Sequence, residues 1–130
     1  MAQILDSAGK PTTIQNTHLS KWIDEMVALC KPEKVVLCDG SEEEKRRLTE
    51  LAVSQGVLIP LNQEKLPGCY LHRSNPNDVA RVEGLTFICT NTKDEAGPTN
   101  NWMDPKEAYG KLSKLFDGSM KGRTMYVVPY

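Results

Sequence analysis

The sequence predicts an α/β domain, a mixed β-sheet with flanking helices. Short apolar runs rich in β-branched residues alternate along the chain with amphipathic stretches that begin with helix-capping residues. A strand, a helix and a second strand are expected within the 28 residues 34–61, the length of a βαβ unit with a parallel crossover. Of the 130 residues, 39% are hydrophobic, so one domain with an ordinary core is expected. The predicted order is α-β-α-β-β-α-β-α-β.

The first predicted elements are a helix before Pro32 and a strand after it. Thr17 is the expected N-cap, and Pro32 ends the helix. Its apolar face consists of Leu19, Ile23, Met26, Val27 and Cys30. Residues 34–38 then form a short, nearly all-apolar run, typical of a strand covered on both faces. Residues 1–16 lack such a pattern, and we expect them to be a flexible segment preceding a domain over 17–130.

The second predicted helix begins in an acidic stretch. Ser41 and Glu44 form an S-x-x-E capping box, and Gly56 ends the helix. Its expected inward-facing residues are Leu48, Leu51 and Ala52. Its expected i,i+4 ion pairs are Glu42–Arg46 and Glu43–Arg47. Because acidic groups suit the positive end of a helix dipole, we interpret the charge run as a solvated helix start rather than a functional site.

Two strands and a helical turn are predicted in the middle of the chain. Residues 57–61 form a strand that is expected to pair in parallel with residues 34–38, and its Pro60 places it at a sheet edge or at the strand's own end. Residues 69–73 form a short strand after a Pro-Gly turn, and residues 75–78 begin a brief helical turn.

The last third is predicted to contain a strand, a long loop, a helix and a final strand. The strands cover residues 85–90 and 123–128, and residues 91–103 form a polar loop of 13 residues, a length that is usually functional or disordered. The helix starts at Asp104-Pro105 and ends at Gly118. Its expected buried stripe is Ala108, Leu112, Leu115 and Phe116.

Charge and hydropathy argue against two classes of protein. The 16 basic and 17 acidic residues give a net charge of −1, which does not support a general nucleic-acid-binding surface. No apolar run approaches the roughly 18 residues that span a bilayer, and the first residues lack the apolar stretch of a signal peptide. We therefore expect a cytoplasmic protein with neither nucleic-acid nor membrane partners.

The cysteines and histidines do not indicate a metal site. There is no C-x-x-C pair, and no histidine stands at zinc-ligand spacing from a cysteine. We expect His18 and His72 to be surface or packing residues. Four cysteines have apolar neighbours and are expected to be reduced core residues: Cys30, Cys38, Cys69 and Cys89.

Composition and spacing reveal no catalytic constellation, and only single residues remain as candidates. Arg81 and Glu83 lie two apart just before Gly84 and a predicted strand. A guanidinium can hold a carboxylate or phosphate by paired hydrogen bonds, although a surface loop of ion-pairing residues gives the same pattern. Lys121 and Arg123 form a second basic spot, too small to indicate a ligand.

Four ordered blocks of sequence carry a resemblance to a known family. They read L-C-D-G-S-E-E-E at 37–44, N-P-N-D-V-A-R-V-E at 75–83, A-G-P-T-N-N-W-M at 96–103 and M-K-G-R-T-M-Y-V-V-P at 120–129. In this order and spacing they resemble the N-terminal portion of the GTP-dependent phosphoenolpyruvate carboxykinases, enzymes several times longer. The resemblance covers nearly everything after about residue 17, and it implies the mixed α/β fold of their N-terminal domain.

The resemblance also implies a reaction and two residue roles. These enzymes convert oxaloacetate and GTP to phosphoenolpyruvate, GDP and carbon dioxide, a step of gluconeogenesis. The arginine of the D-V-A-R motif contacts the substrate anion, so Arg81 inherits substrate binding, and Glu83 helps its mobile loop to meet a closing lid. The positions that bind the nucleotide and Mn²⁺ or Mg²⁺ lie beyond this sequence. No catalytic, metal or nucleotide residue is therefore assigned here, and no cofactor is expected on these residues.

We accordingly expect a non-catalytic fragment whose partner is the remainder of the parent enzyme. Two alternatives stay open. A stand-alone module would bind a small anion through Arg81 and the loop 91–103. A purely structural or interaction domain would show neither affinity nor activity.

Overall fold

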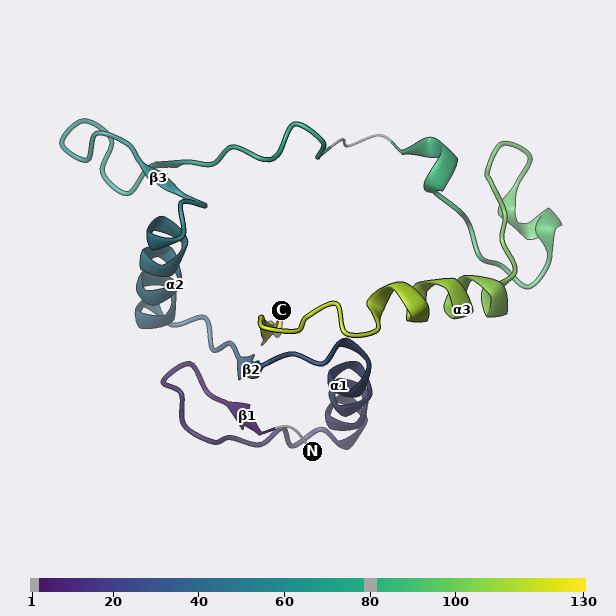
Figure 1. Cartoon of the computed structure of the whole chain (residues 1–130), viewed down its shortest axis with the longest axis horizontal. Helices are drawn as coiled ribbons and strands as arrows, with labels where there is room; N and C mark the ends of the chain where they lie inside the picture. Colours follow the sequence, from purple (N-terminus) through teal and green to yellow (C-terminus); the bar gives the residue numbers. More distant parts are fainter. Residues whose placement is uncertain (1–2, 79–81) are drawn as a thin grey trace. The chain divides into compact units, whose positions relative to one another are not determined.

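The computed structural model describes residues 3–78 and 82–130, and their contacts divide the chain into two compact units. One unit comprises Met1–Leu37 and Arg81–Val127, and the other comprises Cys38–Ala80 and Val128–Tyr130. Figure 1 traces the helices and strands of both units. A parallel sheet, a small antiparallel sheet and α-helices confirm the predicted α/β class. None of the helices in the described residues is long and apolar enough to cross a membrane.

The parallel sheet is the core of the first unit. Its strand order is β1 (Ile4–Leu5), β2 (Lys34–Leu37) and β5 (Thr124–Val127), so β2 has a neighbour on each side. Val35, at the centre of β2, is only 1% exposed. The predicted final strand, residues 123–128, corresponds to β5 and pairs with β2. A nearly all-apolar strand such as β2 is expected inside a sheet, with neighbours on both sides. No element was expected within residues 1–16, yet β1 lies there.

Helix α1 (Thr17–Cys30) buries Ile23 and Cys30. Its N-cap is Asn16 rather than Thr17, because the Asn16 side chain accepts a hydrogen bond from the Leu19 backbone N–H at 3.1 Å. The helix ends at Lys31, whose φ of 55° is left-handed. Of the predicted apolar face, Leu19 is exposed.

Helix α3 (Pro105–Phe116) begins as predicted. Asp104 caps it by accepting from the backbone N–H groups of Lys106 and Glu107 at 2.9 and 3.2 Å. The segment after α3 joins it to α1, because the Gly118 N–H donates to the Leu29 carbonyl at 2.8 Å. The predicted buried stripe is wrong for three of its members, since only Ala108 is buried and the others are at least half exposed: Leu112, Leu115 and Phe116. The capping residues therefore define where this helix begins, although most of its apolar face is exposed.

Helix α2 (Glu42–Ser54) belongs to the second unit and begins at Ser41, whose hydroxyl accepts from the Glu44 N–H at 3.1 Å. Gly56, at φ 72°, follows the helix as expected. The predicted i,i+4 ion pairs are wrong. The charged side chains pair with other partners instead, as the i,i+3 pairs Lys45–Glu42 and Arg46–Glu43 and the i,i+4 pair Arg46–Glu50. Among the expected inward-facing residues, Leu51 is exposed.

Strands β3 (Ile59–Pro60) and β4 (Tyr70–Leu71) form a separate antiparallel pair. The expected parallel pairing of residues 57–61 with residues 34–38 is wrong, since β1 and β5 occupy both edges of β2. Two causes favour the local partner. Pro60 lacks an N–H to donate to a sheet, and Tyr70 stands only ten residues further along the chain, so closing the loop costs little entropy.

Residues 83–103 hold turns where a strand and an open loop were expected. The 3₁₀ turns η1 (Glu83–Leu85) and η2 (Lys93–Ala96) lie here, and residues 85–90 make only an isolated parallel bridge, Ile88 with Trp102. Residues 75–78, where a brief helical turn was expected to begin, form a turn closed by the Asp78 N–H on the Asn75 carbonyl at 2.8 Å, and residues 79–81, which would continue it, lie outside the described residues. A strand requires a run of backbone hydrogen bonds to a neighbouring strand, and residues 85–90 make only the single bridge to Trp102.

The four cysteines are free thiols, as expected, but only two of them are in the core. Cys30 ends α1 and Cys38 follows β2, and both are buried. Cys69 and Cys89 are exposed, because one lies in the loop before β4 and the other in the extended segment after η1. Apolar sequence neighbours predict burial only where a sheet or helix covers them.

Candidate functional site

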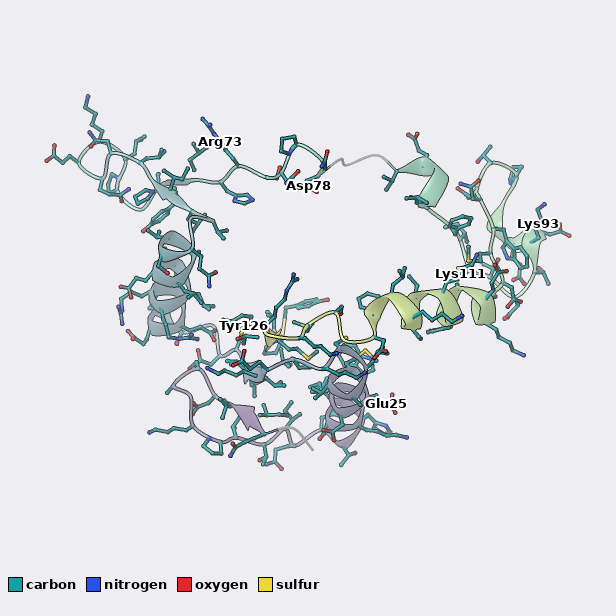
Figure 2. All side chains as sticks on the ribbon, in the orientation of Figure 1. Glu25, Arg73, Asp78, Lys93, Lys111 and Tyr126 are labelled. Carbon is teal, nitrogen blue, oxygen red and sulfur yellow. The ribbon has the colours of Figure 1, made fainter. Side chains whose placement is uncertain are left out.

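The structure describes only one of the two predicted site residues. The described chain stops at Asp78 and resumes at Val82 (Figure 2), so Arg81 lies outside the described residues. Glu83 is described; it opens the turn η1 and its side chain is exposed. The site that can be built is therefore the turn that follows Arg81 in the chain.

The η1 turn is closed by short backbone hydrogen bonds. The Leu85 N–H donates to the Val82 carbonyl at 2.9 Å, and the Thr86 N–H donates to the Glu83 carbonyl at 3.2 Å. The Thr86 hydroxyl also donates to the Val82 carbonyl at 3.0 Å. Leu85 is 78% exposed, so burial contributes little to holding this turn.

The end of the 91–103 loop is hydrogen-bonded to the turn and to the residues after it. The Asn101 carboxamide donates to the carbonyl oxygens of Glu83 at 2.8 Å and Thr86 at 3.2 Å. The Ile88 N–H donates to the Asn101 carbonyl at 2.8 Å, and the Met103 N–H donates to the Ile88 carbonyl at 3.3 Å. Together these bonds form a ladder between residues 83–88 and residues 101–103.

Trp102 extends this ladder. Its indole N–H donates to the Thr90 carbonyl at 3.1 Å, and Asp104, the N-cap of α3, comes two residues later. Residues 96–103 form one of the family-like sequence blocks, and the role that the sequence suggested for them was anion binding by the whole loop 91–103 in a stand-alone module. The sequence does hold a signal for the backbone-bonding role that the structure shows, because Asn100, Asn101 and Trp102 carry side-chain N–H donors that can bond to backbone carbonyls, and they stand shortly before the helix cap Asp104.

The rest of the loop is ordered by its own polar contacts. The Thr92 N–H donates to the Glu95 carboxylate at 3.3 Å, and the Asn100 carboxamide donates to the buried Ala96 carbonyl at 2.7 Å. The loop therefore has a defined conformation. Lys121 and Arg123, the second basic spot, flank the turn that enters β5.

The acidic stretch within residues 37–44 contains a buried carboxylate, that of Glu44, and is not an exposed acidic patch throughout. Glu44 is 5% exposed and accepts from the Asp39 and Gly40 N–H groups at 3.1 and 2.9 Å, so it reaches past the Ser41 N–H that a simple capping box would use. Burial and the neighbouring Glu44 raise the pKa of the Cys38 thiol. The interpretation of this run as a solvated helix start is confirmed for Glu42 and Glu43 only.

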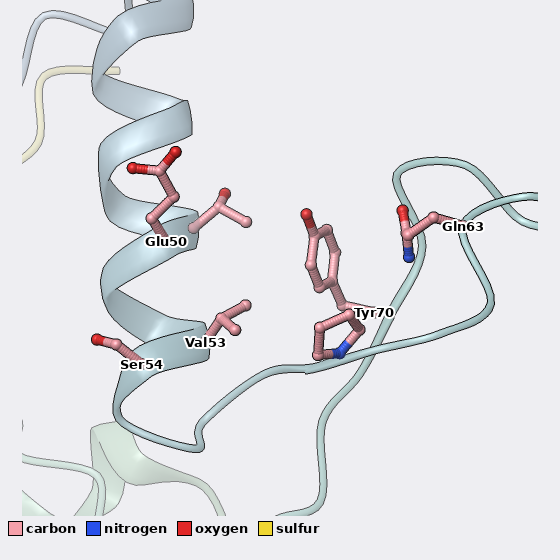
Figure 3. A pocket seen from close by; sticks show the side chains of 7 residues that line it. Glu50, Val53, Ser54, Gln63 and Tyr70 are labelled. Carbon is pink, nitrogen blue, oxygen red and sulfur yellow. The ribbon is translucent and has the colours of Figure 1, made fainter.

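A shallow cavity of about 330 Å³ lies between α2 and the β3–β4 hairpin (Figure 3). Val53 on the helix faces Tyr70 on the hairpin, and Glu50 and Gln63 also line the cavity. Glu83 does not line it, and all the residues that do belong to the second unit.

Metal binding has no support in the part of the chain that the structure describes. There, no three His, Cys, Asp or Glu side chains come close enough together to hold an ion. The described residues therefore do not fit the Mn²⁺ or Mg²⁺ that the resemblance implies for the whole enzyme.

Comparison with known proteins gives consistent matches. The family model of the phosphoenolpyruvate carboxykinase N-terminal domain matches residues 21–130. The protein named phosphoenolpyruvate carboxykinase [GTP] from Anaeromyxobacter dehalogenans strain 2CP-C is 69% identical over 123 residues, which are 95% of this chain and 20% of that protein. Proteins of the same name from Corynebacterium kroppenstedtii and Neocallimastix frontalis are 57% and 51% identical, over 92% of this chain and 19% and 20% of their own lengths.

These relatives are long proteins, and the chain spans about one fifth of their length. The match of residues 21–130 nevertheless covers most of the chain. The chain therefore belongs to the phosphoenolpyruvate carboxykinase N-terminal domain family.

Proposed function

We propose that this chain supplies part of the substrate-binding site of a GTP-dependent phosphoenolpyruvate carboxykinase, which converts oxaloacetate and GTP to phosphoenolpyruvate, GDP and carbon dioxide in gluconeogenesis. The observation that supports this most is the 69% identity to a protein of that name over 95% of the chain. In this proposal the remaining four fifths of such an enzyme supply the nucleotide and metal sites. A cytoplasmic location goes with the proposal.

Arg81 is the residue that we assign to the substrate. Oxaloacetate and phosphoenolpyruvate both present carboxylate oxygens, which a planar guanidinium holds by two parallel hydrogen bonds. Glu83 is assigned a contact with a closing lid, and its exposed position on η1 is compatible with that role. No step of the reaction is assigned to a metal ion on the described residues.

The test uses a hybrid enzyme. In it, the 123 matched residues of the Anaeromyxobacter dehalogenans protein are replaced by the corresponding residues of this chain. Arg81→Lys keeps the charge but loses the paired geometry, and losing a charge-assisted contact costs about 1.5–3 kcal/mol. We expect kcat/KM for oxaloacetate to fall by roughly ten-fold to a few hundred-fold, with GTP affinity unchanged. An unchanged kcat/KM, or a loss confined to GTP binding, would contradict the assignment.

A further inference from the structure

We propose that the peptide bond between Asp39 and Gly40 is a site of spontaneous isoaspartate formation, and that the buried carboxylate of Glu44 restrains this reaction. The inference concerns the second unit alone and does not depend on the function proposed above. Asp39 and Gly40 are both exposed. Apart from the chain neighbours of Gly40, no atom of the described residues lies within 4 Å of the position that a Cβ on this glycine would take. Water therefore reaches this peptide bond, and the backbone has room to move.

The reaction needs only the chain and water. The Gly40 backbone nitrogen attacks Cγ of the protonated Asp39 side chain. A C–N bond forms, one Cγ–O bond breaks, and the hydroxyl group leaves as water with the proton of the nitrogen, which gives a five-membered succinimide ring. A water molecule then adds to the backbone carbonyl carbon of Asp39 and breaks its bond to the nitrogen. The chain now continues through Cγ as isoaspartate, with no change of mass and no transfer of electrons.

The side chain of Asp39 is already turned towards the attacking nitrogen. Its Oδ1 accepts a hydrogen bond from the Ser41 N–H at 2.8 Å. A hydrogen bond from an aspartate side chain to the backbone two residues further on forms an Asx turn, which folds the carboxyl group back over the intervening peptide. Here that peptide contains the Gly40 nitrogen, and Gly40 adopts a φ of 70°, which glycine tolerates. The reacting atoms are therefore held on the same side of the chain, which favours ring closure.

Glu44 restrains the attacking nitrogen. Its Oε2 accepts from the Gly40 N–H at 2.9 Å and from the Asp39 N–H at 3.1 Å, so one oxygen fixes both peptide groups that flank the Asp39 Cα. Glu44 is 5% exposed, and hydrogen bonds to a charged acceptor are stronger than those between neutral groups. To attack Cγ, the nitrogen must leave the plane of its peptide group, and this breaks its bond to the carboxylate. The reaction therefore waits for a local opening of the segment.

A second Asp-Gly sequence, Asp117-Gly118, provides an internal reference. The Gly118 N–H is bonded to a backbone carbonyl at 2.8 Å. Lys31 pairs with the Asp117 carboxylate and lowers its pKa, so the protonated form that reacts is scarcer there. These residues belong to the first unit, and none of these contacts involves Glu44. The rate at Asp117 therefore reports general unfolding of the chain, whereas the rate at Asp39 also reports the loss of the Glu44 contacts.

The experiment stores the 130-residue chain in mildly acidic buffer and measures isoaspartate at each Asp-Gly site over time. Peptide mapping with a protease that cleaves before aspartate but not before isoaspartate gives both rates. In the unsubstituted chain we expect Asp39 to react about ten-fold more slowly than in a synthetic peptide of residues 36–46. Glu44→Ala should raise the rate at Asp39 about ten-fold and leave that at Asp117 within about two-fold. Glu43→Ala is the matched control, because it removes a charge from the same helix without touching Gly40, and it should change neither rate more than about two-fold.

Every outcome bears on the inference. A rate at Asp39 that equals the peptide's, or that Glu44→Ala leaves unchanged or lowers, would overturn the restraint by Glu44. Should Glu44→Ala unfold the chain, both sites speed up together, and Glu44→Gln decides. Its carboxamide oxygen still accepts a hydrogen bond but carries no charge, so the rate at Asp39 alone should rise about three-fold. Equal rises at both sites in this variant would also overturn the inference.

Discussion

Replacing Glu44 by alanine is expected to lower the free energy of unfolding of the chain by about 1.5–3 kcal/mol. The Glu44 carboxylate accepts two backbone hydrogen bonds, from Asp39 at 3.1 Å and Gly40 at 2.9 Å. A hydrogen bond to a charged group contributes about 1.5–3 kcal/mol, so two give a gross value of about 3–6 kcal/mol.

Two features of the structure reduce that gross value. Asp39 and Gly40 are exposed, so water can reach their N–H groups once the carboxylate is gone. The second carboxylate oxygen, Oε1, is buried without a hydrogen bond, and the Arg47 Nη2 is 4.0 Å away from it, so part of the desolvation cost of the charge is not recovered. The net loss is therefore about half of the gross value.

Glu43→Ala is the matched control on the same helix. Its carboxylate is exposed and pairs with Arg46, a surface contact screened by water, so its loss should leave the free energy of unfolding nearly unchanged. Glu44→Gln keeps an acceptor without the charge and should cost about 1 kcal/mol. Urea unfolding followed by circular dichroism gives all three differences. If Glu44→Ala costs no more than Glu43→Ala, the buried carboxylate does not hold this helix start.

Three further predictions concern acid stability, thiol reactivity and activity. The hydrogen bond from Lys31 lowers the pKa of Asp117 below its ordinary value of 3.8. The pair therefore stabilises the fold above pH 3.8, and this stabilisation is lost as the pH falls through the lowered pKa. Asp117→Asn should flatten the decline of the urea midpoint between about pH 5 and pH 2. Alkylation followed by mass spectrometry should modify Cys69 and Cys89 well before Cys38, which is buried and whose pKa is raised, and equal rates would show that Cys38 is open to solvent. The 130-residue chain alone should not consume GTP with oxaloacetate, and metal-dependent GTP consumption by the purified chain would contradict this.

The local elements were predictable from sequence because their causes are local. Asp104-Pro105, Ser41 and Gly56 mark helix ends through their own side chain or backbone freedom, and the structure uses all three. The apolar run after Pro32 predicted β2 because a strand with neighbours on both sides must be apolar on both faces.

Strand pairing was not predictable in the same way. The partners of β2 come from the two ends of the chain, and the distance between them along the sequence leaves no local mark on either. A βαβ spacing favoured residues 57–61, but strand length and Pro60 decided otherwise. The exposure of Leu112 and Leu115 shows the same limit, since periodicity marks an apolar face without specifying what covers it.

The residues of the candidate site also differ in whether the sequence could indicate them. Arg81 and Glu83 were found through a motif, and their roles stay predictions. Asn101 was not found, because its function in the turn depends on backbone carbonyls that lie about fifteen residues away in sequence and have no side-chain signature.

Oxaloacetate decarboxylation by the hybrid enzyme, measured in parallel with its GTP affinity, tests the central claim most directly. If this chain is the N-terminal domain of a GTP-dependent carboxykinase, it should replace the matched fifth of the Anaeromyxobacter dehalogenans protein and give GTP-dependent turnover within about ten-fold of that protein's own rate. A hybrid that folds and binds GTP normally, yet gives no phosphoenolpyruvate, would contradict the claim.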